Sequence, residues 1–262
     1  MSAMVLYHGE PNGPSLAVLA ALFESGLAVE LKHINLLAGE RHTIPGLTAP
    51  LARDMGVEGE GPVLVVGGEA LTESVFIAQF FDEVAGGVGL QPSDPYAHWQ
   101  MLMWCRRMTE RGAPAYAWLG CKASAHDTLA AIGDDAFAEI ISPIVSEDLT
   151  QRWRDIRSGA FPQELTDDSR AKIKAGVATV EAQLADGRDW LMGEFSIADL
   201  ESTGWNMGTV ALVPDAFDGF PLAAAWQQRV LARPSVQRAL ALATVPDPEK
   251  SWAPGPEINR WG

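Results

Sequence analysis

The apolar and polar positions in the first third of the chain predict strands that alternate with helices. Apolar runs of strand length cover residues 4–8, 29–36 and 63–66. Helical apolar patterns begin at Ser15 and Ser74, and serine is a favourable residue for a helix start. Gly67 and Gly68 are typical of a two-residue hairpin turn. The pattern predicts a β-α-β unit, a long connection over residues 38–60 and a β-β-α unit, which together form a thioredoxin-like α/β arrangement.

Beyond residue 95 the pattern changes to helical periodicity without a convincing strand. Helices are predicted at about residues 95–120, 125–150, 166–186, 196–212 and 221–242. Ser196 and Asp199 form a capping box before one apolar segment, and prolines after residue 245 predict an extended tail. The predicted units are a thioredoxin-like domain (1–86), a linker (87–95), an all-α domain (96–245) and a C-terminal tail (246–262).

The composition adds the expectation of a large core and an acidic surface. Of the 262 residues, 47% are hydrophobic and 20% are charged, which is enough apolar material for a sizeable core. The formal net charge of -15 disfavours a nucleic acid or an anionic membrane as partner, because both require a basic surface. No signal peptide and no apolar run of about 18 residues is visible, so a cytoplasmic location is predicted.

The cysteine pattern favours core thiols over a disulfide framework. Cys105 and Cys121 lie in helical surroundings, and neither belongs to a Cys-x-x-Cys pair. No His, Cys, Asp or Glu cluster has the spacing of metal ligands, so no metal is expected.

The stretch from Pro62 to Ser74 predicts an anion site. A helix that begins at Ser74 would leave its first backbone N–H groups unused, and such groups bind carboxylates. Pro62 opens a strand at a position where its missing N–H is tolerated. The sequence therefore places a carboxylate pocket beside a proline.

Three features together resemble the cytosolic glutathione transferases. They are Pro62 at the strand start, Thr72-Glu73-Ser74 at the next helix, and Ser196-Ile197-Ala198-Asp199 in the helical part. Residues 151–165 contain Trp153, three arginines and the run Gly159-Ala160-Phe161-Pro162-Gln163-Glu164. This segment more narrowly resembles that of the S-selective branch of bacterial β-etherases, which cleave lignin-derived aryl ethers. Gly61 departs from the family pattern, which usually has an aliphatic residue before the proline.

The resemblance implies glutathione as cosubstrate and a helix start that stabilises its thiolate. Ser15 would donate its hydroxyl to the sulfur, and the amide of Asn12 would be a second donor. Residues 11–16 contain no cysteine, so glutathione itself would be the nucleophile. The residues alone leave another interpretation open, in which Ser15 is only a helix cap and Asn12 only a turn residue.

The resemblance also implies a clamp for the glutathione peptide. Glu73 and Ser74 would hold the γ-glutamyl end, and the backbone of Gly61 beside a cis Pro62 would pair with the cysteinyl part. His42 would meet the glycyl carboxylate. The alternatives are a plain capping serine and a solvated histidine in a loop.

The second substrate is expected between the two domains, in a hydrophobic pocket that Tyr116 and Trp118 line. The implied reaction is displacement of a phenol by the thiolate, with inversion, at a carbon next to a ketone. Two alternatives stay open: a general detoxifying glutathione transferase that acts on other electrophiles, and a non-catalytic binding protein with the same fold. Homodimerisation is implied by analogy with the fold.

Overall fold

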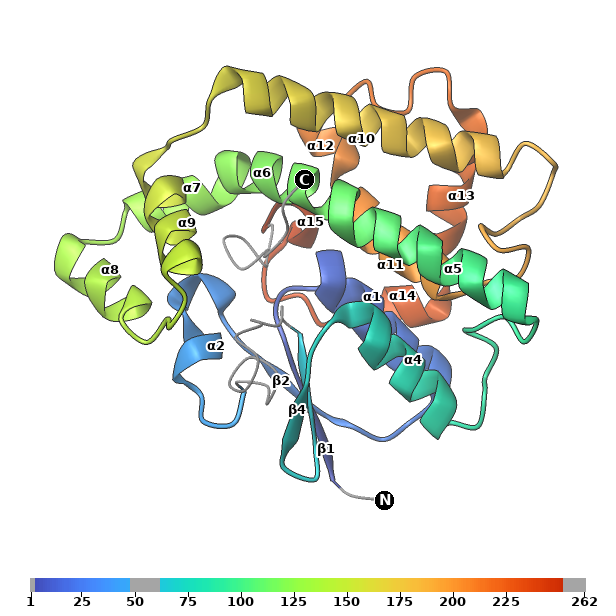
Figure 1. Cartoon of the computed structure of the whole chain (residues 1–262), viewed down its shortest axis with the longest axis horizontal. Helices are drawn as coiled ribbons and strands as arrows, with labels where there is room; N and C mark the ends of the chain where they lie inside the picture. The colour runs from blue at the N-terminus through green and yellow to red at the C-terminus, as the bar shows by residue number, and fades with distance from the viewer. Residues whose placement is uncertain (1–2, 48–61, 252–262) are drawn as a thin grey trace.

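The structure is a computed structural model that describes residues 3–47 and 62–251. A small β-sheet occupies one end of the molecule, and a larger group of helices occupies the other (Figure 1). The strands are β1 (Met4–His8), β2 (Glu30–His33), β3 (Val63–Val66) and β4 (Glu69–Leu71), in the order β2-β1-β3-β4. Among the other described residues, the only strand-like pairing is an isolated bridge between Met192 and Glu194.

Because of the strand directions, four of the segments that connect strands and helices lie at the same edge of the sheet. β2 is parallel to β1, whereas β3 is antiparallel to both β1 and β4. β1, β2 and β4 therefore end at the same edge, and the segment that leads into β3 arrives there. Beyond this edge begin α1 (Gly13–Ser25), η1 (Leu36–Ala38), α2 (Glu40–Thr43) and α4 (Ser74–Val84). The predicted thioredoxin-like arrangement is confirmed.

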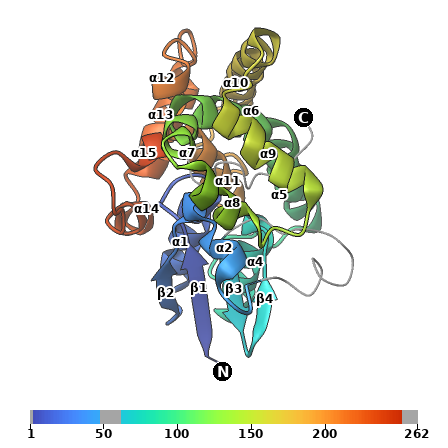
Figure 2. The same cartoon turned by 90° about the vertical axis from the view of Figure 1, so that its left-hand side faces the viewer.

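α1 lies between the sheet and the helical part, which explains why it is apolar on every face. Leu16, Val18 and Leu19 point in different directions from the helix, and all three are buried. α1 contacts α4, α11 (Ile197–Asn206) and α14 (Pro234–Leu240) (Figure 2). α1 is therefore held by elements from both halves of the chain.

The other helices form the all-α part. They are α5 (Pro95–Arg107), α6 (Ala113–Gly120), α7 (His126–Ala130), α8 (Asp134–Ile141), α9 (Glu147–Ser158), α10 (Gln163–Gln183), α12 (Thr209–Leu212), α13 (Pro221–Leu231) and α15 (Pro248–Ser251). The π-helical segments η2 (Met108–Gly112) and η3 (Cys121–Ala125) connect α5, α6 and α7 without a loop. No helix in residues 3–47 and 62–251 has the length and apolar character of a membrane span.

Several predicted boundaries differ from those of the structure. The single helix predicted over 125–150 is wrong, because the chain leaves helical geometry near Gly133 and Pro143 and forms α7, α8 and α9. The predicted strand over 29–36 ends at His33, since the side chain of Asn35 accepts a hydrogen bond from the N–H of Ala38 and caps η1. Ser74 is the first residue of α4 and not its cap, which is Glu73.

The predicted capping box at α11 is present and is fully buried. Oδ2 of Asp199 accepts hydrogen bonds from the N–H and the hydroxyl of Ser196, at 3.0 and 3.1 Å. Oδ1 accepts from the N–H of Leu191 at 3.0 Å and from Nε1 of Trp226 at 2.8 Å. Burial is the largest influence on this carboxyl and raises the pKa of Asp199 to about 6. One side chain therefore joins α11, α13 and the loop before α11.

Both cysteines are free and buried, which confirms the predicted core thiols. Burial raises the pKa of the Cys105 thiol well above its ordinary value, and that of Cys121 to about 12. Both thiols are protonated at neutral pH, so neither supplies a nucleophile.

Replacing Gly204 with alanine is expected to lower the free energy of unfolding by about 1–3 kcal/mol. A Cβ at this position of α11 would lie 2.4 Å from the carbonyl oxygen of Gly13, so α11 would have to move away from α1. Gly176→Ala on α10 is the matched control, because its Cβ would meet nothing within 4 Å. The control is expected to gain up to about 1 kcal/mol from better helix propensity. Urea denaturation of both variants measures the difference; equal changes in both would contradict the close packing.

Candidate active site

Ser15 lies in the first turn of α1, just beyond the end of β1. Its side chain is 3% exposed, and its Oγ accepts a hydrogen bond of 3.1 Å from the N–H of Gly9. The hydroxyl proton is therefore left for another acceptor. The N–H groups of Gly13 and Ser15 have no acceptor within the helix, and Pro14 has no N–H. The start of α1 thus offers several donors, and the positive end of the helix dipole, to an anion.

Asn12 immediately precedes α1, and its amide is bonded to residues 244–251, which we call the C-terminal segment. Nδ2 donates to the carbonyl oxygen of Pro248 at 2.6 Å and to Oγ of Ser251 at 2.9 Å. A carbonyl oxygen only accepts, so the amide nitrogen must face Pro248, and this fixes the orientation of the amide. Both amide hydrogens of Asn12 are therefore engaged by the C-terminal segment. Oδ1 is buried and has no hydrogen-bond partner within the described ranges.

Glu10, which lies two residues before Asn12, also binds the C-terminal segment. Its carboxylate accepts hydrogen bonds from the N–H of Thr244 at 3.0 Å and from the hydroxyl of Thr244. Nε2 of His33 lies 3.1 Å from Oε1 of Glu10. Glu10 is 8% exposed, and a buried carboxylate is stable only when donors of this kind surround it. The turn before Ser15 is therefore fastened to the C-terminal segment at two points.

Burial also affects the histidine at the end of β1. It lowers the pKa of His8, whose Nδ1 lies 2.8 Å from the carbonyl oxygen of Gly9. The ring meets that of His33 edge to face, with the centroids 5.8 Å apart. His8 is therefore neutral at neutral pH and adds no positive charge to this edge of the sheet.

A cavity of about 430 Å³ lies between the C-terminal segment and the connection that follows β2. Leu36 and Leu37 supply apolar surface on one side, and Val245 and Pro246 supply it on the other. Further lining residues are Glu10, His33, Ile34, Asn35, Ser124, Thr128, Thr244, Asp247, Lys250 and Ser251. Glu10 and Ser251 connect this cavity directly to the turn that carries Ser15 and Asn12.

The backbone before α4 has an unusual conformation at Glu73. Its φ is 72° and its ψ is 110°, and no other non-glycine residue in the described ranges has a positive φ. Such a conformation costs of the order of 1–3 kcal/mol and is concentrated at functional sites. Ser74, next in the chain, is 7% exposed, and its hydroxyl makes no hydrogen bond to the described residues. The first N–H groups of α4 lie beside it, and free N–H groups at a helix start are the kind of donors that bind anions.

The other predicted glutathione contacts lie at the same edge or outside the described residues. Pro62 is buried and immediately precedes β3. His42 is half-buried in α2, beside the buried Arg41. Gly61 lies outside the described residues. The topology thus brings Ser15, Asn12, His42, Pro62, Glu73 and Ser74 to one edge of the sheet.

Tyr116 and Trp118, predicted to line the substrate pocket, are anchored among helices. Tyr116 is 1% exposed, and its ring stacks on that of Trp205 with the centroids 6.4 Å apart. Its hydroxyl donates a hydrogen bond to Oδ1 of Asn206. Burial raises the pKa of Tyr116, so its phenol stays neutral. Nε1 of Trp118 donates to Thr166 at 3.3 Å. Neither residue lines the cavity beside the C-terminal segment.

Sequence reasoning missed Glu10 and the C-terminal segment. Glu10 belongs to a turn of ordinary composition, and Thr244 to a proline-rich stretch without periodicity. The only local signal is that a carboxylate stands immediately before the turn formers Pro11 and Asn12. Glu10 and Thr244 are separated by 234 positions in the sequence, so no local pattern reveals that they pair.

Comparison with known proteins gives matches over both halves of the chain. The family model described as glutathione S-transferase, N-terminal domain, matches residues 2–83, and the C-terminal domain model matches residues 132–234. Protein LigF of Sphingobium sp. (strain NBRC 103272 / SYK-6) is 28% identical over 245 residues, which cover 88% of this chain and 91% of that protein.

Solved structures of glutathione transferases and of a β-etherase also match most of this chain. The crystal structure of the β-etherase LigF from Sphingobium sp. strain SYK-6 matches with a TM-score of 0.78 at 26% identity. The match covers 91% of this chain and 99% of that chain. The structure of glutathione transferase F7 from Populus trichocarpa has a similar fold, with a TM-score of 0.64 at 23% identity over 91% of this chain and 98% of that chain.

Proposed function

Because the chain belongs to the glutathione S-transferase family of enzymes, which use glutathione as cosubstrate, we propose that it cleaves β-aryl ether bonds in lignin-derived aromatic ketones. The observation that carries this proposal is the likeness to the Sphingobium β-etherase, which extends over most of both chains in sequence and in structure. The arrangement of donors at the sheet edge supports a glutathione thiolate as the nucleophile.

We assign the sulfur of glutathione to the start of α1. The hydroxyl of Ser15 accepts from Gly9 and keeps its proton for the thiolate, and the N–H groups of Gly13 and Ser15 add to the stabilisation. Asn12 has a positioning role in this proposal, because its amide hydrogens bind the C-terminal segment. Its buried Oδ1 is available to accept a hydrogen bond from an N–H group of the bound tripeptide.

We assign the γ-glutamyl end of glutathione to the corner formed by Glu73 and Ser74. The hydroxyl of Ser74 and the first N–H groups of α4 would bind its carboxylate, and the side chain of Glu73 would face its amine. The strained backbone at Glu73 supports this role. Gly61 and Pro62 are proposed to meet the cysteinyl part, and His42 the glycyl carboxylate.

The reaction forms one bond and breaks one bond at the same carbon. The thiolate attacks the carbon that carries the aryloxy group, from the side opposite to that group. A carbon–sulfur bond forms, and the carbon–oxygen bond breaks with its electron pair going to the aryloxide. The aryloxide then takes a proton and leaves as a phenol, so no oxidant or reductant is consumed. The centre is inverted.

We place the aromatic substrate in the cavity of about 430 Å³ beside the C-terminal segment. Its volume is in the range of small-molecule sites, and it has apolar surface from Leu36, Leu37 and Val245. Tyr116 and Trp118 do not line it, so this cavity gives no support to their predicted contact with the substrate.

The test is to incubate the purified protein with glutathione and each enantiomer of a guaiacylglycerol-type β-aryl ether ketone. Guaiacol release and a glutathione thioether of inverted configuration are expected from one enantiomer in preference to the other. Chiral chromatography of the products measures both. The absence of phenol release from either enantiomer, at a glutathione concentration that saturates the protein, would contradict the proposal.

The same experiment separates the two alternatives. Conjugation of 1-chloro-2,4-dinitrobenzene without ether cleavage would indicate a general detoxifying transferase. A failure to bind glutathione would indicate a non-catalytic protein of this fold. Homodimerisation and a cytoplasmic location stay predictions; the large exposed side chains of Phe76 on α4 and of Tyr96 and Trp99 on α5 support the first.

A further inference from the structure

His33 is the last residue of β2 and lies on the wall of the cavity of about 430 Å³ beside the C-terminal segment. Imidazole is the side chain that exchanges protons most readily near neutral pH, and the departing aryloxide needs a proton. Ser15 and the N–H groups at the start of α1 are assigned to the sulfur. The aryloxide leaves from the opposite side of the reacting carbon, so its proton has to come from another group.

A buried carboxylate fixes the imidazole of His33. Nε2 of His33 lies 3.1 Å from Oε1 of Glu10, and the N–H and hydroxyl of Thr244 hold the same carboxylate. When one ring nitrogen donates to a carboxylate, the tautomer is set and the other nitrogen is left for a different partner. That other nitrogen is Nδ1, which makes no hydrogen bond to the residues that the structure describes. A carboxylate in this position also stabilises a positively charged ring.

The charges around the cavity disfavour the release of a free aryloxide. Glu10 is 8% exposed, and its carboxylate belongs to the cavity wall. The other two charged residues of the wall, Lys250 and Asp247, bind each other at 3.1 Å. Burial lowers the pKa of His8, so this ring beside His33 is neutral. An aryloxide would therefore face the charge of Glu10, and protonation of its oxygen removes this repulsion.

His33 also has access to solvent, which a proton donor needs between turnovers. Its side chain is 34% exposed, whereas that of Glu10 is 10% exposed. The ring can therefore take a proton from water after it has given one away, while its carboxylate partner stays in place. The same exposure means that the side chain of His33 contributes little to the core.

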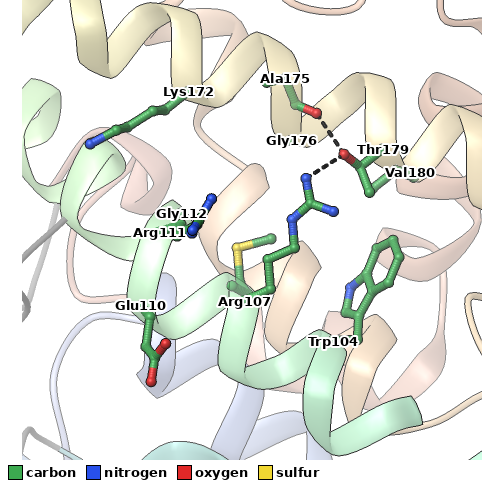
Figure 3. Close-up of a pocket in the computed structure, with 11 residues that line it drawn as sticks. Trp104, Arg107, Glu110, Arg111, Gly112, Lys172, Ala175, Gly176, Thr179 and Val180 are labelled. Carbon is green, nitrogen blue, oxygen red and sulfur yellow. Dashed lines mark hydrogen bonds between the residues drawn. The ribbon is translucent and has the colours of Figure 1, made fainter.

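A second cavity, of about 480 Å³, contains no histidine (Figure 3). It lies between α5, η2 and α10, and none of its lining residues belongs to the sheet edge or to the C-terminal segment. Its titratable side chains are those of Arg107, Glu110, Arg111 and Lys172. Arginine keeps its proton in proteins, and Nη2 of Arg107 is bound to Oγ1 of Thr179 at 2.7 Å (Figure 3). An imidazole therefore distinguishes the cavity that adjoins the turn before Ser15.

We propose that His33 is the general acid of the reaction and that Glu10 is its positioning residue, an inference that rests on the proposed function. As the carbon–oxygen bond breaks, its electron pair goes to the aryloxide oxygen, which takes the proton from Nδ1 of His33. The ring is left neutral, with its Nε2–H still donating to Glu10. The thiol of glutathione releases its proton to water, and His33 regains one from water, so the protons balance over a turnover.

The test compares two β-aryl ether ketones that differ only in the leaving group, which is guaiacol in one and 4-nitrophenol in the other. The anion of 4-nitrophenol is a much weaker base, so it leaves readily without a proton, whereas the anion of guaiacol gains from one. Single-turnover rates at saturating glutathione, with the protein in excess over the ketone, measure the chemical step.

His33→Gln keeps an N–H group for Glu10 but has no proton to transfer. His98→Gln is the matched control, because His98 lies on α5 and lines neither cavity. Glu10→Gln tests the positioning role, since it removes the charge that orients and stabilises the ring. The ultraviolet absorbance of the bound thiolate is followed in each variant, so that a change at the sulfur is detected separately.

In His33→Gln the rate with the guaiacol ether is expected to fall by about 100-fold, and that with the 4-nitrophenol ether by less than about 3-fold. Glu10→Gln is expected to lose about 10-fold with the guaiacol ether and less with the other. His98→Gln is expected to stay within about 2-fold of the wild type with both. The pKa of the bound thiol is expected to be the same in His33→Gln as in the wild type.

An equal loss with the two ethers, or no loss in His33→Gln, would overturn the role of His33 while the proposed function stands. A loss in Glu10→Gln that does not depend on the leaving group would overturn the positioning role of Glu10. A wild type that releases neither phenol would contradict the proposed function itself, and this inference with it.

Discussion

Ser15→Ala is expected to raise the pKa of the bound glutathione thiol by about 1–2 units. A hydrogen bond to a charged group contributes roughly 1.5–3 kcal/mol, and one pKa unit corresponds to about 1.4 kcal/mol. In the wild type the Ser15 hydroxyl accepts from Gly9 and has its proton available for the sulfur. Without it, the thiolate keeps only the backbone N–H groups at the start of α1. At pH values below the wild-type pKa of the thiol, kcat/KM is expected to fall by about 10- to 100-fold, because the thiolate fraction falls by that factor.

The ultraviolet absorbance of the thiolate in the binary complex, followed as a function of pH, measures this pKa directly. Ser25→Ala is the matched control. Ser25 lies at the far end of the same helix, where its hydroxyl donates to the carbonyl oxygen of Leu22 at 2.7 Å. The control is expected to leave the thiol pKa unchanged. A thiol pKa in Ser15→Ala that equals that of the control would show that Ser15 does not act on the sulfur.

Asp199→Asn is expected to lower the free energy of unfolding by about 3–5 kcal/mol. The carboxylate accepts four hydrogen bonds, two at each oxygen. The asparagine amide has an NH₂ group in place of one of these oxygens, and this group donates hydrogen bonds but does not accept them. If the NH₂ group faces Ser196, the backbone N–H of Ser196 loses its acceptor. If it faces the other way, the N–H of Leu191 and Nε1 of Trp226 lose theirs.

Chemical denaturation measures this loss, with Asp189→Asn as the control. Asp189 is 73% exposed and lies 3.6 Å from Arg229, and an ion pair at such a site contributes at most about 1 kcal/mol. Equal losses in the two variants would show that the buried network around Asp199 does not stabilise the fold.

The loss in Asp199→Asn is also expected to depend on pH. Burial raises the pKa of Asp199 from an ordinary value of 3.8 to about 6, so the folded state binds a proton more readily than the unfolded chain. Protonation of Asp199 therefore stabilises the folded state. This contribution is fully present below pH ~4 and is lost as the pH rises through about 6. The difference between wild type and variant should therefore be about 1 kcal/mol larger at pH 5 than at pH 7.5. A difference that stays constant, or that shrinks towards pH 5, would contradict the raised pKa.

The sequence predicts those features whose causes are local. The strand at residues 4–8, the hairpin after β3 and the capping box at Ser196 depend on neighbouring residues, and all three appear in the structure. The prediction of one helix over residues 125–150 is wrong. The apolar spacing continues across Gly133 and Pro143, where the chain leaves helical geometry, so the spacing alone does not reveal the breaks.

The features that sequence reasoning missed have distant causes. Nothing near Glu73 favours a positive φ, since a glutamate in isolation avoids it, so only the surrounding fold imposes that conformation. The family resemblance implies that Asn12 donates to the sulfur, yet its amide donates to the carbonyl oxygen of Pro248, 236 residues away.

The bonds from Glu10 and Asn12 to the C-terminal segment also affect the order in which the site is completed during synthesis. A ribosome makes the chain from its N-terminus, so Thr244 is added 234 residues after its partner Glu10. A growing chain that already has the sheet, α1 and α4 still lacks one wall of the cavity proposed for the electrophile. The glutathione half of the site would therefore form first, and the wall that faces the electrophile would form only when residues 244–251 reach Glu10 and Asn12.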